Sequence, residues 1–224
     1  EQGPILEDEG VTIGVVTGVQ GISWTEVVVV GQSAHAGTTP MRLRHDPAYC
    51  AGAIVTFVRD LTRRLGTEQV GTVGRVELYP NLVNVVPSRA VMTVDLRNTD
   101  ERVLQDAEGR LAAFLDELAA SEGVEITTRS LSRFEPVSFD PEMIDRVESA
   151  AGRLGYSTRR MASGAGHDAQ MLARVCPTAM VFTPSVNGLS HNIAEFTHAA
   201  DIEAGTNVLL QVLLELLDEP DGRR

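Results

Sequence analysis

The spacing of apolar residues divides most of the chain into strands and helices. Short apolar or alternating runs predict strands over residues 11–19, 24–30, 70–79, 89–97, 124–131 and 178–183. Apolar residues at helical spacing predict helices over residues 46–66, 98–123, 140–155 and 202–216. The strand over 89–97 alternates most clearly, with Ala90, Met92, Val94 and Leu96 on its core face.

Residues at the helix ends support these boundaries. Asp46 and Pro47 are typical of a helix start, and Gly66 is typical of a helix end. Asn98 and Glu101 have the spacing of a capping box, which predicts that Asn98 caps the second helix.

The order of these elements predicts an α/β fold with an inserted domain. Residues 24–131 follow the order strand–helix–strand–strand–helix–strand, which is the ferredoxin-like order. The flanking parts should share one sheet, so we expect an outer domain from residues 1–21 and 135–224, interrupted by an inserted domain over 22–134. A four-stranded sheet with both helices on one face leaves an open edge, which favours pairing between two copies.

Composition narrows the functional classes. The 224 residues are 43% hydrophobic and carry a formal net charge of −12, which argues against a nucleic-acid or anionic-membrane surface. All 19 basic residues are arginine, so lysine-based chemistry is excluded. Cys50 and Cys176 favour buried thiols in a reducing, cytoplasmic compartment, with a single disulfide as the alternative. We find no signal peptide, and the apolar run over 208–217 is too short to span a bilayer.

The stretch Gly31–Met41 places one histidine, His35, among small residues between a strand and a helix. Gly37 permits unusual backbone shapes, and Pro40 stiffens the exit of the loop. A histidine presented in this way suits proton transfer or transition-state stabilisation, and a turn-capping histidine is the alternative.

Two other loops carry candidate chemistry. Ser163–Asp168 is a glycine-rich turn before a short helix and could hold an anion, although capping by His167 and Asp168 is an equal alternative. His191 follows a buried strand, where a neutral imidazole could bind a divalent metal or simply occupy a loop.

Two polar residues remain as candidates for substrate binding. Asn84 sits in a turn bounded by prolines, which also explains an asparagine by turn chemistry alone. Arg97 lies on the non-core face of its strand, where it could fork onto a carboxylate or pair with Asp95.

Taken together, these motifs resemble one family. The matching segments are Gly31–Met41, Asn84-Val-Val-Pro87, Asp95-Leu-Arg97, Ser163–Gln170 and Ser190-His191-Asn192. The chain resembles the N-carbamoyl-L-amino-acid hydrolases, together with β-ureidopropionase and allantoate amidohydrolase, over nearly its whole length. These enzymes belong to the aminoacylase and carboxypeptidase-like superfamily of dinuclear metal hydrolases.

The resemblance implies a role for each matching residue. His191 matches a metal ligand, and His35 matches the lid histidine that stabilises the tetrahedral oxyanion. Residues matched to substrate contacts are Gln2, Asn84, Arg97, Gly164 and Gly166. The resemblance also implies two divalent ions, zinc or manganese, and a homodimer through the lid domain, with His35, Asn84 and Arg97 serving the neighbouring subunit's site.

One departure from the family motif affects the expected activity. The family reads His-x-Glu-Gln-Gly-Pro, whereas this chain begins at the glutamate, so that histidine and the other upstream ligands lie outside it. We therefore expect an incomplete metallopeptidase-like catalytic domain with an inserted lid.

The expected function of the complete protein is hydrolysis of a ureido or amide bond in a small, carboxylate-bearing molecule. The substrates left open are N-carbamoyl amino acids, ureidopropionate, allantoate and ureidoglycolate. The alternatives are an inactive lid and dimerisation fragment, or an amidase or dipeptidase of the same superfamily.

Overall fold

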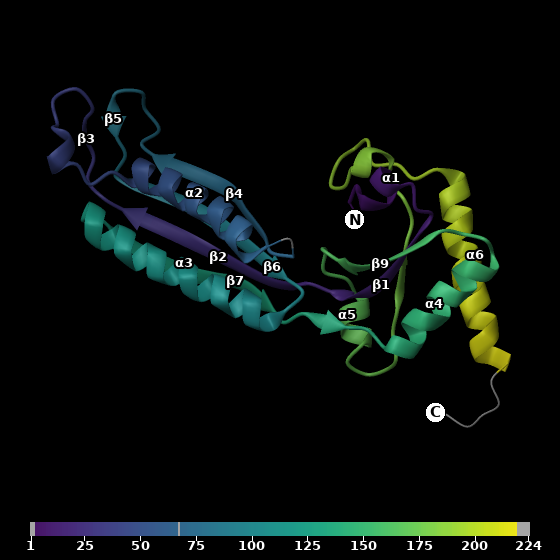
Figure 1. Ribbon diagram of the computed structural model, residues 1–224. Helices are drawn as coiled ribbons and strands as arrows, with labels where there is room; N and C mark the ends of the chain where they lie inside the picture. Colours follow the sequence, from purple (N-terminus) through teal and green to yellow (C-terminus); the bar gives the residue numbers. More distant parts are fainter. Residues whose placement is uncertain (1–2, 67, 219–224) are drawn as a thin grey trace. The chain divides into compact units, whose positions relative to one another are not determined.

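The chain folds into two compact units (Figure 1), and its mixed α/β structure is as predicted. The computed structural model describes residues 3–66 and 68–218. Unit 1 is built from the described parts of residues 1–20 and 137–224, and unit 2 comprises Gly21–Pro136.

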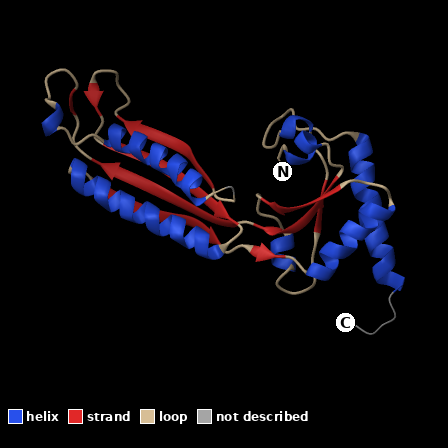
Figure 2. Ribbon diagram, viewed as in Figure 1, coloured by secondary structure: helices blue, strands red, loops and turns tan. Residues whose placement is uncertain are grey.

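Unit 2 is a four-stranded antiparallel sheet with two long helices (Figure 2). In chain order its main elements are β2 (Gly21–Val30), α2 (Pro47–Leu65), β4 (Val70–Tyr79), β6 (Arg89–Asn98), α3 (Glu101–Glu122) and β7 (Glu125–Phe134). The strands lie in the order β4-β6-β2-β7, so β4 and β7 form the edges. Two short strands, β3 (Ala34–His35) and β5 (Val85–Val86), pair separately, and the 3-10 helix η1 (Met41–Leu43) follows β3.

The core of unit 2 follows the alternation in the sequence. The residues of β6 that were expected to face inward are buried: Ala90, Met92, Val94 and Leu96. The apolar residues that pack against them are buried as well, namely Ile54, Val58 and Leu61 of α2 and Leu104, Leu111 and Leu115 of α3. The burial of these side chains provides the main driving force for this unit.

The helix ends are as predicted in one case and different in the other. The side chain of Asp46 accepts hydrogen bonds from the backbone of Ala48 and Tyr49 and so caps α2, as expected. The prediction for α3 is wrong, because Asp100 is its cap. Asn98 is buried instead, with its amide donating to Gln69 and its oxygen accepting from the backbone of Asp100.

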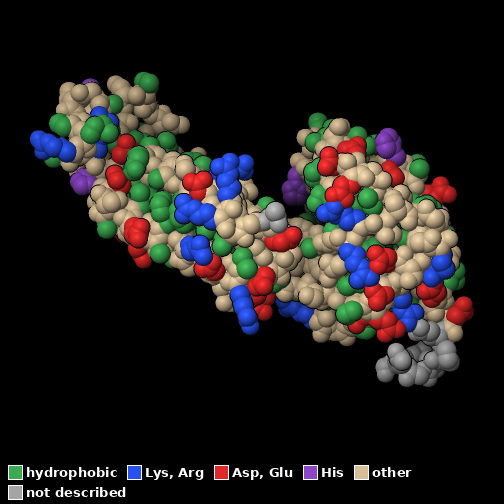
Figure 3. Space-filling view, viewed as in Figure 1, with side chains coloured by type: hydrophobic (Ala, Val, Ile, Leu, Met, Phe, Trp, Pro, Cys, Tyr) green, Lys and Arg blue, Asp and Glu red, His purple; other side chains and the backbone are tan. Residues whose placement is uncertain are grey.

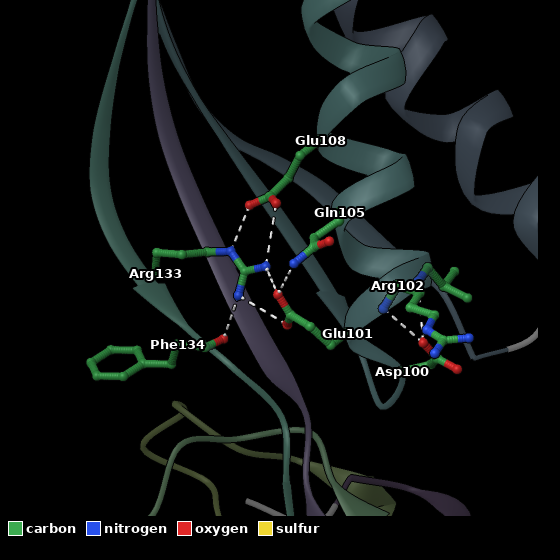
Figure 4. Close-up of polar contacts among 8 residues, drawn as sticks. Asp100, Glu101, Arg102, Gln105, Glu108, Arg133 and Phe134 are labelled. Atoms are coloured by element: carbon green, nitrogen blue, oxygen red, sulfur yellow. Dashed lines mark hydrogen bonds and ion pairs between the residues drawn. The ribbon is translucent and has the colours of Figure 1, made fainter.

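An arginine joins the sheet to α3 at one end of unit 2. Arg133 of β7 reaches Glu101 at 2.6 Å and Glu108 at 2.7 Å, and it also donates to the carbonyl of Phe134 (Figure 4). Burial alone would lower the pKa of Arg133, but its bonds to the two carboxylates outweigh this and raise the pKa. The partly buried network links the end of β7 to the first turns of α3.

Unit 1 is organised around β1 (Ile13–Val19). This strand pairs with β8 (Val137–Ser138) and β10 (Met180–Phe182) in antiparallel fashion and with β9 (Thr158–Ser163) in parallel. The helices are α1 (Ile5–Glu9), α4 (Pro141–Arg153), α5 (Ala169–Leu172) and α6 (Ala199–Asp218), and η2 (Val186–Gly188) is a 3-10 turn. The sharing of one sheet by the two ends of the chain is as predicted, whereas the strands β8 and β9 were not predicted.

The two longest helices of unit 1 pack against its sheet. Ile144 and Val147 of α4 and Val208 and Val212 of α6 are buried in one cluster with β1. Exposed leucines lie along the rest of α6: Leu209, Leu210, Leu213, Leu214, Leu216 and Leu217. Among the described residues, no helix has both the length and the apolar character needed to cross a membrane.

The two cysteines are free thiols, which rules out the disulfide alternative. Cys50 lies in the core of unit 2, where burial, followed by the charges of Glu122 and Asp46, raises its pKa from 9.0 to about 11. Cys176 is exposed, so the expectation of two buried thiols is correct only for Cys50.

Candidate functional site

The short sheet of unit 2 brings two candidate residues together. His35 ends β3 and pairs with Val85 of β5, while the backbone N–H of Ala36 donates to the carbonyl of Asn84 at 3.0 Å. The sequence reasoning missed β5, although the apolar pair Val85-Val86 between Asn84 and Pro87 was its signal. Asn84, the residue before β5, therefore lies next to the segment that carries His35, and both residues are exposed.

The imidazole of His35 is held by the turn that follows it. Its Nδ1 accepts from the backbone N–H of Gly37 at 3.1 Å and of Thr38 at 3.3 Å. A Cβ at Gly37 would lie 3.3 Å from Cε1 of the ring, so a larger residue would crowd this contact. Because Nδ1 is an acceptor, the proton of the neutral ring lies on Nε2, which makes Nε2–H the available donor.

The exposed end of unit 2 around His35 also carries apolar side chains. Met41 and Leu43 in η1 and Leu82 and Val83 before β5 are 75%, 54%, 60% and 103% exposed, respectively. Figure 3 shows hydrophobic side chains among the polar ones at this end of the unit. Exposed apolar residues around a polar pair are typical of a surface that contacts another molecule.

Arg97 lies at the other end of β6. It makes bonds to both oxygens of Asp95, at 2.8 Å for its Nη2 and 3.0 Å for its Nε, and its guanidinium lies 5.8 Å from the ring centre of Trp24. The predicted pairing with Asp95 is thus present. Whether Arg97 also binds substrate stays a prediction.

The distance along β6 separates Arg97 from His35 and Asn84. Val30, which leads into the His35 loop, pairs with Arg89, whereas Ile22 at the start of β2 pairs with Arg97. From Arg89 to Arg97 an extended strand covers about 26 Å, at roughly 3.3 Å per residue. A single copy of unit 2 therefore holds Arg97 far from His35 and Asn84. Whether all three serve a neighbouring subunit's site stays a prediction.

The glycine-rich turn of unit 1 uses its own side chains as caps. The Nδ1 of His167 accepts from the backbone of Ala169 at 3.1 Å, and Gln170 accepts from the backbone of His167. Asp168 makes no side-chain cap bond, so the predicted capping is correct for His167 only. These two N–H groups are already paired, which argues against the anion cradle. Gly164 and Gly166 are exposed on this turn, and their contact with substrate remains a prediction.

His191 lies in the loop that follows β10. Its backbone has φ of 54°, in the left-handed region that non-glycine residues rarely adopt and that occurs often at functional sites. Gln2, the remaining predicted substrate contact, lies outside the described residues.

The side chains present do not fit a dinuclear metal site. Among residues 3–66 and 68–218, no group of three or more histidine, cysteine, aspartate or glutamate side chains could hold a metal ion. A dinuclear site needs several such ligands around both ions. His191 is thus a candidate for a single ligand, and no reaction step through a metal follows from this chain.

Comparison with known proteins identifies the family. The family model described as peptidase family M20/M25/M40 matches residues 1–215. An N-carbamoyl-L-amino-acid amidohydrolase of Rhizobium meliloti is 40% identical over 215 residues, which cover 96% of this chain and 52% of that protein. An allantoate amidohydrolase of Escherichia coli is 39% identical over 220 residues, covering 96% of this chain and 53% of that protein.

A solved structure agrees with these matches. The amidase of the hydantoinase/carbamoylase family from Burkholderia multivorans superposes with a TM-score of 0.95 and 44% identity, covering 98% of this chain and 54% of that one. The chain thus spans about half the length of the relatives that it matches. In sequence and in fold, the chain belongs to peptidase family M20/M25/M40.

Proposed function

We propose that the complete polypeptide containing these residues hydrolyses a ureido or amide C–N bond in a small carboxylate-bearing molecule, such as an N-carbamoyl amino acid or allantoate. The proposal rests on the pairing of β3 with β5, which brings Asn84 beside the His35 loop, and on the orientation of the His35 ring. Relatives named for both activities support this substrate class. In this proposal unit 2 is the ferredoxin-like lid, inserted into a catalytic domain to which unit 1 belongs.

The residues of unit 2 would act through hydrogen bonds and charge. Attack on the carbonyl carbon places negative charge on its oxygen, and the Nε2–H of His35 would donate to that oxygen. The amide of Asn84, which directly precedes the adjacent strand β5, would hold the substrate beside it. Arg97 would bind the substrate carboxylate with its planar fork and fix the orientation of the reacting group.

The same proposal requires two copies of the chain. Since Arg97 lies about 26 Å from the His35 end of β6, the two residues can reach one substrate only from different copies. The exposed apolar residues beside His35 support this, because they would be covered when this end of unit 2 meets the second copy. We infer a homodimer in which one copy contributes His35 and Asn84 and the other contributes Arg97.

Divalent metal ions, zinc or manganese, belong to the proposal for the complete polypeptide. His191 would be one ligand, with the remaining ligands outside the described residues. Bound metal would activate water and polarise the carbonyl of the substrate.

Assays of the complete polypeptide test this function. Ammonia release should be measured with N-carbamoyl amino acids, ureidopropionate, allantoate and ureidoglycolate, and compared with dipeptides and simple amides. His35→Ala should lower kcat about a hundredfold or more, the scale of losing one oxyanion donor. Turnover of dipeptides alone would favour the peptidase alternative, and unchanged kcat in His35→Ala would contradict the assigned role.

A second possibility concerns these 224 residues by themselves. Because the described residues form no group of metal ligands, the isolated chain should act only as a lid and dimerisation module. The test is to purify it, add zinc or manganese, and measure bound metal and ammonia release. Two tightly bound ions with turnover would show that the ligands are misassigned.

A further inference from the structure

Arg44 makes an unusual set of bonds for an arginine of this chain. Its Nε donates to the carbonyl of Thr39 at 3.0 Å, and its Nη2 donates to the carbonyl of Ala36 at 2.5 Å. In the part of the chain that the structure describes, no carboxylate pairs with it, whereas Arg97 and Arg133 are held by acidic side chains. The guanidinium of Arg44 is therefore committed to the backbone of the turn after His35.

The bonds of Arg44 and of His35 meet on one peptide group. The carbonyl of Ala36 accepts from Arg44, and the N–H of the same planar unit, contributed by Gly37, donates to Nδ1 of His35. Hydrogen bonds linked through a peptide polarise one another, so a charged donor at the carbonyl strengthens donation by the N–H. The second bond of Arg44, to Thr39, closes the other end of the same turn.

We propose that Arg44 is a positioning residue that acts on His35 through the Ala36–Gly37 peptide and keeps the ring proton on Nε2. The inference rests on the proposed function only in assigning His35 as the oxyanion donor. Donation to Nδ1 withdraws electron density from the ring and makes Nε2–H a stronger donor. Arg44 thereby orients the imidazole and improves its hydrogen bond without touching substrate.

The geometry requires an arginine rather than any cation. Two carbonyls from separate positions of the turn are met by two different nitrogens of one rigid, planar group. A lysine would place one compact ammonium there and could satisfy the turn only in part. The effect of Arg44→Lys on the turn and on the His35 ring should therefore be smaller than that of Arg44→Met.

The experiment compares three variants of the complete polypeptide: Arg44→Met, Arg44→Lys and the control Arg42→Met. Arg42 lies in η1, two residues away, and its exposed side chain makes no hydrogen bond with the described residues. The readouts are the ring nitrogen resonances of isotope-labelled His35, assigned with His35→Ala, and amide exchange at Gly37 and Thr38. Kinetic constants and the melting temperature are measured on the same samples.

In Arg44→Met we expect exchange at Gly37 and Thr38 to be about tenfold faster and a proton to appear on Nδ1 in part of the molecules. We also expect kcat to fall about tenfold with little change in KM, while Arg42→Met behaves like wild type. Unchanged ring resonances and exchange in Arg44→Met would overturn the proposal, as would faster exchange spread evenly over unit 2.

Two further outcomes complete the test. If Arg44→Met does not fold, the His35 ring resonances of Arg44→Lys test the proposal instead. Resonances like those of the wild type in that variant would refute the positioning role. If His35→Ala hydrolyses normally while the ring signals still respond to Arg44→Met, the proposed function fails and the positioning role stands.

Discussion

We predict that two inactive variants of the complete polypeptide, His35→Ala and Arg97→Ala, regain activity when their subunits are mixed. Since about 26 Å of strand separates the two ends of β6, a site that uses both residues must take them from different copies. A hybrid dimer then has one site with both native residues and one site with both lesions. Random exchange at equal concentrations makes half of the dimers hybrid, so activity should recover to about a quarter of wild type.

The assay follows ammonia release after the variants are mixed, with different affinity tags on the two chains to measure the hybrid fraction. The control pairs His35→Ala with Asn84→Ala. His35 lies on β3 and Asn84 directly precedes β5, so the two residues are neighbours. Both substitutions therefore damage the part of the site that the same copy contributes. Every site of such a hybrid lacks one of them, and no recovery is expected.

The reasoning would be refuted by hybrid dimers of His35→Ala and Arg97→Ala that form in the expected proportion and remain inactive. Equal recovery in the control mixture would also refute it, because it would show that His35 and Asn84 serve different sites.

Three other changes follow from the structure. Arg97→Lys should lower kcat/KM about tenfold or more with little change in melting temperature, because a point charge replaces a planar fork; unchanged kinetics with a large loss of stability would assign Arg97 to its Asp95 pair. Arg133→Met should lower the free energy of unfolding by about 2 kcal/mol, because it leaves two partly buried carboxylates without their partner. The control Arg129→Met removes a side chain that is 69% exposed and should change the free energy of unfolding by less than about 1 kcal/mol. Equal effects of the two variants in denaturant titrations would contradict this prediction. The pKa of Cys50, raised by burial from 9.0 to about 11, keeps its thiol neutral in the folded state after the unfolded thiol has ionised, so the free energy of unfolding should fall between these pH values; Cys50→Ala should remove this part of the pH dependence.

The sequence by itself determined the four long strands and the two long helices of unit 2, because local rules and burial agree there. Alternation in β6 and helical spacing in α2 specify their core faces, and the structure buries those faces. Asp46 acts as the expected cap because its neighbours offer it free N–H groups. The same rules mistook Asn98 for a cap, since its burial beside Gln69 depends on a contact between distant residues.

The family was also readable from the sequence, because the segments that match it are short and continuous in the chain. They include the run around His35 and the glycine-rich turn that ends at Asp168. Such motifs name candidate residues, but they do not show which residues lie beside them in space.

Only the tertiary structure decided how those candidates are arranged. The pairing of β3 with β5 brings Asn84 beside the His35 loop, although the two residues are 49 positions apart and no local spacing encodes this contact. The length of β6 separates Arg97 from both, although Asn84 and Arg97 are only 13 positions apart in the sequence. An extended strand converts a short sequence separation into a long distance, whereas hydrogen bonds between strands bring distant segments together.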